Sequence, residues 1–288
     1  MRVLCLHGVG GSGALLKQQL TPFIRALDPS YEFVFVDGPV QSPRGPGIAP
    51  SATGPFFSHT VGYEPQQILE ACQHLEEVIE ESGPFDGALG FSQGAALIVS
   101  LMHLWQCNGK ESPFAFALFF SSSTPCAARD DACTALISRL RSKSLDHSHE
   151  GSLKLRESDS LTAEEQIYWS LLCDTVFPAR RNNFLHPPFD LDAYTDPQHP
   201  RDAPLTMHPA LHDWRIRIPT VHCIGSRDAP SMQGMSRSAY EMCAGDVSKL
   251  LYHGGGHQPP QKQAEAAAAA AATEWAINQS RKALRLRL

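Results

Sequence analysis

Short apolar runs alternate with longer amphipathic segments along the chain, and this pattern predicts alternating strands and helices. The strand-like runs are Arg2–Leu6, Glu32–Val36, Asp86–Leu89, Ala115–Phe120, Thr220–Ile224 and Lys249–Tyr252. Helix-like segments lie between them, at Ala14–Leu27, Glu64–Glu81, Gln93–Cys107, Met232–Cys243 and Gln261–Asn278. Strands separated by helices are typical of βαβ units, in which parallel strands share one sheet and helices cover both of its faces. We therefore expect an α/β fold with a mostly parallel, doubly wound sheet.

Two segments interrupt this alternation. Residues 38–62 are rich in Pro, Gly and Ser, and such a segment suits neither a helix nor a central strand. Residues 121–214 separate two predicted strands and are too long for an ordinary connection. We expect them to form a partly helical lid over the strand ends, where α/β proteins bind ligands, with a solvated excursion as the alternative. The helical patterns in this inserted segment are at Cys133–Ser142 and Ala163–Val176.

Composition supports one globular domain. The chain has 288 residues, of which 42% are hydrophobic, and its net charge is −6 with no long basic run. These features argue against disorder and against a nucleic-acid-binding surface. We expect a single domain over residues 1–280, with residues 281–288 as a C-terminal tail. The chain shows no apolar run long enough to span a membrane, and its first residues do not resemble a signal peptide.

The eight cysteines are scattered and form no C-x-x-C pairs. This spacing argues against structural zinc and against a disulfide framework, and it favours a reducing, cytoplasmic location. An oxidised pair between Cys126 and Cys133 is the open alternative, because the two residues are close in sequence.

A G-x-S-x-G motif is the strongest chemical signal. Gly90-Phe91-Ser92-Gln93-Gly94 directly follows a predicted strand and directly precedes a predicted helix. In this context the motif predicts a nucleophile elbow, a sharp turn that exposes the serine hydroxyl at the edge of the sheet. The helix N-terminus that follows directs backbone N–H groups toward a developing oxyanion. We therefore expect Ser92 to be a nucleophile.

A serine nucleophile needs a base and an orienting acid, which follow it in the chain order Ser, Asp or Glu, His. Asp228 lies just after one predicted strand, and His257 lies in a glycine-rich loop after the last one. His253 is the alternative base. Asp174 and Asp202 are alternative acids only if the inserted segment folds over the site. The preferred set is Ser92, Asp228 and His257.

The first turn, residues 6–13, is also rich in glycine. Its sequence LHGVGGSG lacks both the G-x-G-x-x-G spacing of a dinucleotide site and the G-K-[ST] of a phosphate loop. We interpret it as an oxyanion loop in which the Val9 N–H acts together with the Gln93 N–H, with Gly10 as the alternative donor. His7 is expected to fix this loop by hydrogen bonds.

Five segments together resemble the fungal serine hydrolase family of α/β hydrolases. They are LHGVGGSG at 6–13, SGPFDGALGFSQGAAL at 82–97, PFAFALFFSSSTP at 113–125, IPTVHCIGSRD at 218–228 and HGGGHQPP at 253–260. The family is related to the human ovarian-cancer-associated gene 2 product. It includes trans-acting thioesterases of fungal polyketide pathways, such as the lovastatin-releasing type, and short-chain esterases. The resemblance implies Ser92 as nucleophile, Asp228 as acid and His257 as base.

The resemblance covers roughly residues 1–125 and 205–280, and the segment between them departs from the family's compact form. It implies hydrolysis of an acyl thioester or ester through an acyl-enzyme, most specifically release of a polyketide or fatty acyl chain from an acyl carrier protein. A short-chain carboxylesterase and an acyltransferase or cyclase are the alternatives. No metal or organic cofactor is expected. Phe56 and Phe57 resemble the family's loop beside the pocket, so we expect them to line the acyl pocket or to pack in the core. Gly10 of the first turn is also expected at the pocket.

Overall fold

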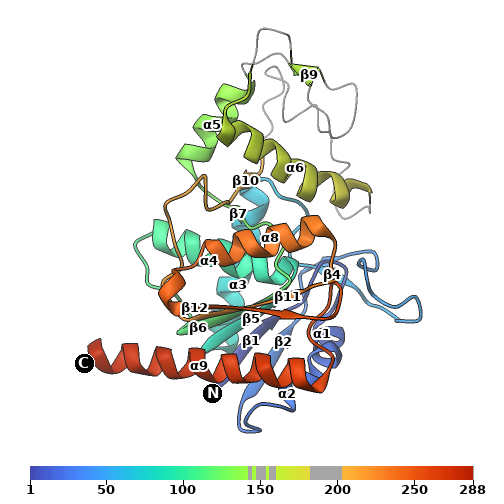
Figure 1. Cartoon of the computed structure of the whole chain (residues 1–288), viewed down its shortest axis with the longest axis vertical. Helices are drawn as coiled ribbons and strands as arrows, with labels where there is room; N and C mark the ends of the chain where they lie inside the picture. The colour runs from blue at the N-terminus through green and yellow to red at the C-terminus, as the bar shows by residue number, and fades with distance from the viewer. Residues whose placement is uncertain (142–144, 147–153, 156–159, 182–202, 288) are drawn as a thin grey trace.

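The computed structural model describes residues 1–141, 145–146, 154–155, 160–181 and 203–287 (Figure 1). Its centre is a six-stranded sheet in which every neighbouring pair of strands is parallel. In spatial order the strands are β12 (Ser248–His253), β11 (Thr220–Gly225), β6 (Phe116–Phe120), β5 (Gly87–Phe91), β1 (Arg2–Leu6) and β2 (Glu32–Val36). Because the strands are parallel, the loops that follow them all emerge at one edge of the sheet. This topology confirms the predicted α/β fold.

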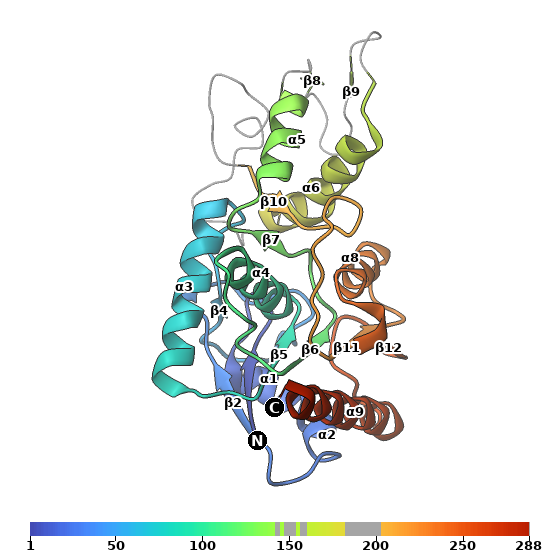
Figure 2. The same cartoon turned by 90° about the vertical axis from the view of Figure 1, so that its left-hand side faces the viewer.

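Helices cover both faces of the sheet (Figures 1 and 2). On one face lie α3 (Pro65–Ser82), α4 (Gln93–Cys107) and α8 (Pro230–Glu241), and on the other α1 (Gly13–Gln19), α2 (Thr21–Ile24) and α9 (Gln263–Arg287). The strands β5, β6 and β11 are buried along their whole length, which explains why their sequences are continuous apolar runs rather than alternating ones. A separate apolar cluster packs on each face.

Two helices differ from the expected boundaries. The expected helix over 14–27 is divided into α1 and α2, because Pro22 has no backbone N–H and occupies the first turn of a new helix instead. The expected last helix continues to Arg287, so residues 281–287 belong to α9 rather than to a separate tail. Leu, Arg, Lys and Ala all have high helix propensity, which favours this continuation.

The Pro-rich segment 38–62 contains a small strand pair, β3 (Val40–Gln41) with β4 (Phe57–Ser58). The Phe57 N–H donates a hydrogen bond of 2.7 Å to the Gly11 carbonyl, and the Gly45 N–H donates one of 2.9 Å to the Gly10 carbonyl. These bonds attach the segment to the first turn of the chain. The segment therefore lies directly beside the loop that was predicted to hold the oxyanion.

The inserted segment forms an additional layer on the face of α3 and α4 (Figures 1 and 2). Its described elements are β7 (Cys126–Ala127), α5 (Asp131–Arg141), β8 (Leu145–Asp146), β9 (Lys154–Leu155), α6 (Ala163–Arg181) and β10 (Leu205–Thr206). The strand β7 pairs with β10, and Tyr168 of α6 is fully buried with its hydroxyl donating to the Pro204 carbonyl. Residues 182–202 of the expected lid lie outside the described residues, so the lid itself stays a prediction.

A buried ion pair joins the two ends of this segment. His212 Nδ1 lies 2.7 Å from Asp130 Oδ2, and both side chains are nearly buried. The other Asp130 oxygen accepts the Cys133 N–H at the start of α5. Burial opposes a charge on His212, but the hydrogen bond and charge of Asp130 outweigh it and raise the pKa of His212. The pair therefore fixes the beginning of α5 against the chain returning to β11.

All eight cysteines are free in the structure, so the alternative of an oxidised Cys126–Cys133 pair is not what the fold contains. Among the described residues, no helix is both long and apolar enough to cross a membrane.

Candidate active site

Ser92 lies at the turn between β5 and α4. Its backbone has φ of 52° and ψ of −114°, a conformation that residues with side chains rarely adopt. A Cβ atom on Gly90 would lie 2.4 Å from Ala95 Cα. A Cβ atom on Gly94 would lie 2.4 Å from the Leu6 carbonyl oxygen. Only glycine fits at both positions, which is the physical reason for the G-x-S-x-G spacing.

The side chains of Ser92, His257 and Asp228 form a continuous chain of hydrogen bonds. His257 Nε2 lies 3.0 Å from Ser92 Oγ, and His257 Nδ1 lies 2.7 Å from Asp228 Oδ2. The other Asp228 oxygen accepts the Ala229 N–H at 2.8 Å. The Asp228 side chain is 3% exposed and the His257 side chain 20% exposed. A substrate can therefore reach the imidazole but not the carboxylate.

The loops that carry Asp228 and His257 are bonded to each other. The Ser226 N–H donates to the His253 carbonyl at 2.8 Å, and the Arg227 N–H donates to the Gly255 carbonyl at 2.9 Å. Both loops follow neighbouring strands, β11 and β12, so they leave the sheet side by side. The acid and the imidazole are thereby placed by backbone hydrogen bonds as well as by their own contact.

The alternative acid and base residues do not reach Ser92 in the described part of the chain. His253 is buried at the end of β12, where its Nδ1 accepts the Gly255 N–H, so it stabilises the loop rather than contacting the serine. Asp174 lies on α6 in the inserted layer. Asp202 lies outside the described residues.

The Val9 and Gln93 N–H groups are available as oxyanion donors. Gln93 is the first residue of α4, and its side chain accepts the His59 N–H at 2.9 Å. In the same helical turn the Gly94 N–H is already bonded to the His7 carbonyl. Across the described ranges, neither the Val9 nor the Gln93 N–H has a backbone partner outside its own element. Val9 also lines the cavity that contains Ser92.

His7 helps to orient the Val9 N–H through the Gly8 carbonyl, which also accepts the Gly11 N–H at 3.1 Å. The Gly38 N–H donates to His7 Nε2 at 3.0 Å, so Nε2 carries no proton and Nδ1 donates to the Gly8 carbonyl at 2.7 Å. The Gly8 C=O and the Val9 N–H belong to one planar trans peptide and point in opposite directions. Burial lowers the pKa of His7, which keeps the ring neutral as this bonding requires. The predicted loop-fixing contacts of His7 are thus present.

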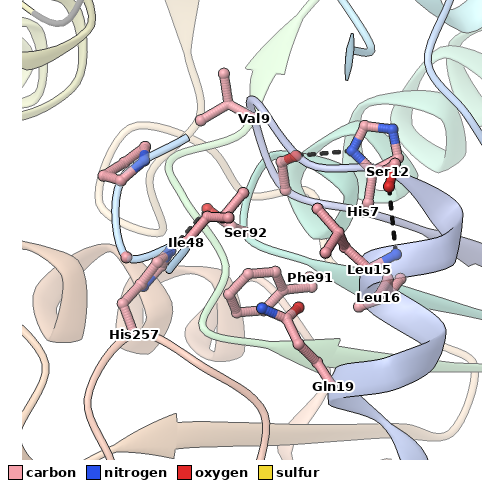
Figure 3. A pocket seen from close by; sticks show the side chains of 13 residues that line it. His7, Val9, Ser12, Leu15, Leu16, Gln19, Ile48, Phe91, Ser92 and His257 are labelled. Atoms are coloured by element: carbon pink, nitrogen blue, oxygen red, sulfur yellow. Dashed lines mark hydrogen bonds between the residues drawn. The ribbon is translucent and has the colours of Figure 1, made fainter. Parts of the chain in front are cut away.

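Ser92 opens into a small cavity of about 30 Å³, which has room for about two water molecules. Ile48 and His257 lie on one side of Ser92, Leu15 and Leu16 on the other, and Phe91 beside them (Figure 3). The Phe91 and His257 rings are 5.0 Å apart. The other lining residues are His7, Gly8, Val9, Ser12, Gln19, Pro46 and Gly47. The cavity accommodates a reacting carbonyl, but a longer substrate must extend beyond it.

Three residues expected at the pocket are not among those that line this cavity in the described structure. Gly10 lies against Gly45, where its carbonyl accepts the Gly45 N–H. Phe57 is turned toward a neighbouring cavity with Ser12, and Phe56 accepts the Ser42 N–H at its carbonyl. The physical reason is that β4 pairs with β3 and bonds to the first turn, which places Ile48 rather than the two phenylalanines beside Ser92.

Sequence reasoning missed the contribution of α1 and of residues 46–48 to the lining. Leu15, Leu16 and Gln19 recur at helical spacing directly after the oxyanion loop, and that position is the signal that could have found them. For Ile48 no local signal exists, because its place depends on how residues 43–48 lie against the first turn.

This arrangement can activate a serine hydroxyl. An imidazole that accepts the hydroxyl proton at Nε2 and donates Nδ1–H to a buried carboxylate has the tautomer needed for a general base. Two free N–H groups beside the same hydroxyl can stabilise an oxyanion. Within the described ranges, no group of three or more His, Cys, Asp or Glu residues is arranged to hold a metal ion.

Comparison with known families agrees with this chemistry. A family model described as "Serine hydrolase (FSH1)" matches residues 1–269. The chain belongs to the FSH1 family. Esterase alnB of Emericella nidulans is 35% identical to this FSH1 hydrolase over 290 residues, which cover 98% of each chain. Hydrolase FUB4 of Gibberella moniliformis is 25% identical over 260 residues, covering 88% of this chain and 90% of its own.

Among solved structures, a carboxylesterase from Mesorhizobium loti matches with a TM-score of 0.46 and 14% identity, covering 94% of this chain and 86% of that one. The FSH1 family assignment and the parallel sheet make this protein a serine hydrolase with an α/β-hydrolase fold.

Proposed function

We propose that this hydrolase cleaves an acyl thioester or ester through an acyl-enzyme formed on Ser92. His257 Nε2 accepts the hydroxyl proton as the oxygen attacks the carbonyl carbon, and Asp228 holds the imidazole in the required tautomer. The observation that carries the proposal is the hydrogen-bonded chain from Ser92 through His257 to Asp228. The acyl bond then breaks, and His257 donates this proton to the leaving sulfur or oxygen. Water attacks the acyl-enzyme while His257 accepts a proton from it, and His257 passes this second proton to Ser92 Oγ as the carboxylic acid leaves.

In this mechanism the Val9 and Gln93 N–H groups stabilise the oxyanion. Each such donor contributes about 3 kcal/mol to the transition state in comparable enzymes. Support comes from the free N–H groups and from the position of both residues around Ser92.

The substrate we propose is a polyketide or fatty acyl chain attached as a thioester to an acyl carrier protein. The support is the resemblance of the core segments to fungal thioesterases of this type. A carrier protein is then a transient partner. A short-chain carboxylesterase is the second candidate, because the similar alnB protein is named an esterase and the cavity at Ser92 is small.

The deciding experiment compares kcat/KM for matched thioesters and oxyesters that share one acyl chain, from short to long. Ser92→Ala serves as the blank. A strong preference for long-chain thioesters supports chain release from a carrier. Equal or faster turnover of short oxyesters supports the carboxylesterase instead. Transfer of the acyl group to an added alcohol in preference to water, or no Ser92-dependent turnover, contradicts hydrolysis as the main reaction.

A further inference from the structure

Two more cavities adjoin the one at Ser92, and both lie between α1 and the segment 46–57. One has a volume of about 250 Å³ and is bounded by Ser12, Pro55 and Phe57 among others. The second has a volume of about 610 Å³ and shares Gln19, Gly47 and Ile48 with the cavity at Ser92. Leu15 lines all three, so the cavities meet around this one side chain.

The larger cavity has an uncharged, hydrogen-bonding lining. Its polar side chains are the amides of Gln18, Gln19 and Gln261 and the hydroxyls of Ser51 and Thr53. None of its lining residues in the described structure carries a charge. Amides and hydroxyls both donate and accept hydrogen bonds, so the lining suits a ligand with neutral groups of the same kind. It is poorly suited to a bare alkyl chain, because such a chain satisfies none of these groups.

This polar cavity lies between α1 and the loop of His257, on the side of that loop that faces α1. Gln261 follows the loop of His257, and its Nε2 donates to the Gln19 carbonyl at 2.9 Å, which joins that loop to α1. On the other side of the cavity, a Cβ atom on Gly47 would lie 3.7 Å from the His257 carbonyl oxygen. In acyl transfer the protonated imidazole donates to the leaving atom, so the leaving group must lie beside the His257 ring.

We propose that the polar cavity binds the pantetheine arm of a thioester substrate as the leaving group. This inference rests on the proposed thioesterase function. The amide and hydroxyl groups of pantetheine match the amides and hydroxyls of the lining. As Ser92 Oγ bonds to the carbonyl carbon, the carbon–sulfur bond breaks and its electron pair goes to sulfur. His257 Nε2 delivers the serine proton to that sulfur, and the free thiol leaves along α1.

The test compares one acyl chain attached either to pantetheine or to propanethiol. The ratio of the two kcat/KM values is measured in the wild type, in the double variant Gln18→Leu with Gln19→Leu, and in Gln73→Leu. Gln73 is an exposed glutamine on α3, on the opposite face of the sheet, and serves as the matched control. We expect a preference for pantetheine that falls roughly tenfold in the double variant, since each lost hydrogen bond costs several-fold. The control keeps the full preference.

A preference that is unchanged in the double variant overturns the proposal. A second substrate pair carries a β-hydroxylated or a plain acyl chain on propanethiol. If the double variant instead changes the ratio of kcat/KM between the β-hydroxylated and the plain acyl chain, the cavity holds the acyl chain and the proposal is wrong.

Inhibition of short-oxyester hydrolysis by free pantetheine separates this inference from the proposed function. Competitive inhibition that weakens in the double variant supports the cavity assignment even if the protein turns over no thioester. Thioester turnover without any dependence on the arm supports the proposed function and contradicts the cavity assignment.

Discussion

Two histidine–aspartate pairs in this chain have the same geometry at one nitrogen and different partners at the other. His257 Nδ1 lies 2.7 Å from Asp228 Oδ2, and His212 Nδ1 lies 2.7 Å from Asp130 Oδ2. His257 Nε2 faces the Ser92 hydroxyl at 3.0 Å, whereas His212 Nε2 faces the Thr206 carbonyl at 3.2 Å. The carboxylates are equivalent, so the second nitrogen distinguishes the two pairs.

The partner of Nε2 determines what each imidazole can do. A backbone carbonyl only accepts, so both nitrogens of His212 must donate, and the ring is held as a cation. The raised pKa of His212 agrees with this bonding. A hydroxyl can donate, so His257 can remain neutral and accept the serine proton. A close carboxylate alone therefore does not identify a catalytic histidine, and the group at the other nitrogen must be known.

The largest expected effect on kcat comes from removing the carboxylate that is hydrogen-bonded to His257. Asp228→Asn should lower kcat on the order of 10⁴-fold, because an amide does not hold the imidazole in the required tautomer. The exposed Asp246, changed to Asn, is the control. Steady-state kinetics on an acyl ester provide the measurement, and thermal unfolding verifies that both variants are folded. A near-wild-type rate in Asp228→Asn would assign the acid to another residue.

The same substitution in the other pair should act on stability instead. Asp130→Asn removes the charge and the hydrogen bond that keep the proton on His212, so the buried imidazole loses its pairing and the free energy of unfolding should fall by about 3 kcal/mol. The exposed neighbour Asp131, changed to Asn, should alter it by less than about 0.5 kcal/mol. Urea denaturation measures both, and kcat of the folded Asp130→Asn protein should remain at the wild-type value. A large loss of kcat with unchanged stability would show that the two pairs are not functionally distinct.

His7 has no carboxylate hydrogen-bonded to its ring. It tests at a third position whether the groups bonded to the two ring nitrogens decide what a histidine does. His7→Phe removes one of the two hydrogen bonds that orient the Gly8–Val9 peptide and should lower kcat by up to about 10²-fold, the cost of one oxyanion donor. KM should change much less, because the donor acts mainly in the transition state. His7→Asn retains a donor and should recover part of the loss. Equal kcat in the Phe variant and the wild type would exclude this positioning role.

The smallest expected effect is a pH dependence. Because the pKa of His212 is raised above the ordinary 6.5, its pairing stabilises the fold fully below that pH. This contribution is lost as pH rises through the raised pKa. The difference in unfolding free energy between wild type and His212→Asn should therefore shrink at alkaline pH. A difference that grows with pH would contradict the charged state of His212.

Much of the fold was predictable because its signals are local. The strands β1 and β2 have the predicted bounds, and α4 begins and ends where its apolar spacing indicated. The elbow was predictable for the same reason, since two glycines, a strand and a helix all lie within a few residues of Ser92. Asp228 and His257 were found because parallel strands bring their C-terminal ends to one edge.

Other features depend on contacts between distant segments and left no local pattern. The ion pair of Asp130 with His212 joins two ends of the inserted segment, and neither residue lies in a recognisable motif. Ile48 lies beside Ser92 only because the Gly45 N–H bonds to the Gly10 carbonyl. The expectation that Phe56 and Phe57 line the acyl pocket or pack in the core rested on the resemblance of their segment to the family's loop, and it could not include the pairing of β3 with β4.

The active site draws on both ends of the sequence, and this has a consequence for its synthesis. Val9 and Ser92 are translated early, whereas His257 follows β12, the edge strand of the sheet. A growing chain on the ribosome therefore contains the serine before it contains the base. Acyl cleavage begins only after β12 and the loop behind it have left the exit tunnel. Activity thus marks the completion of the sheet.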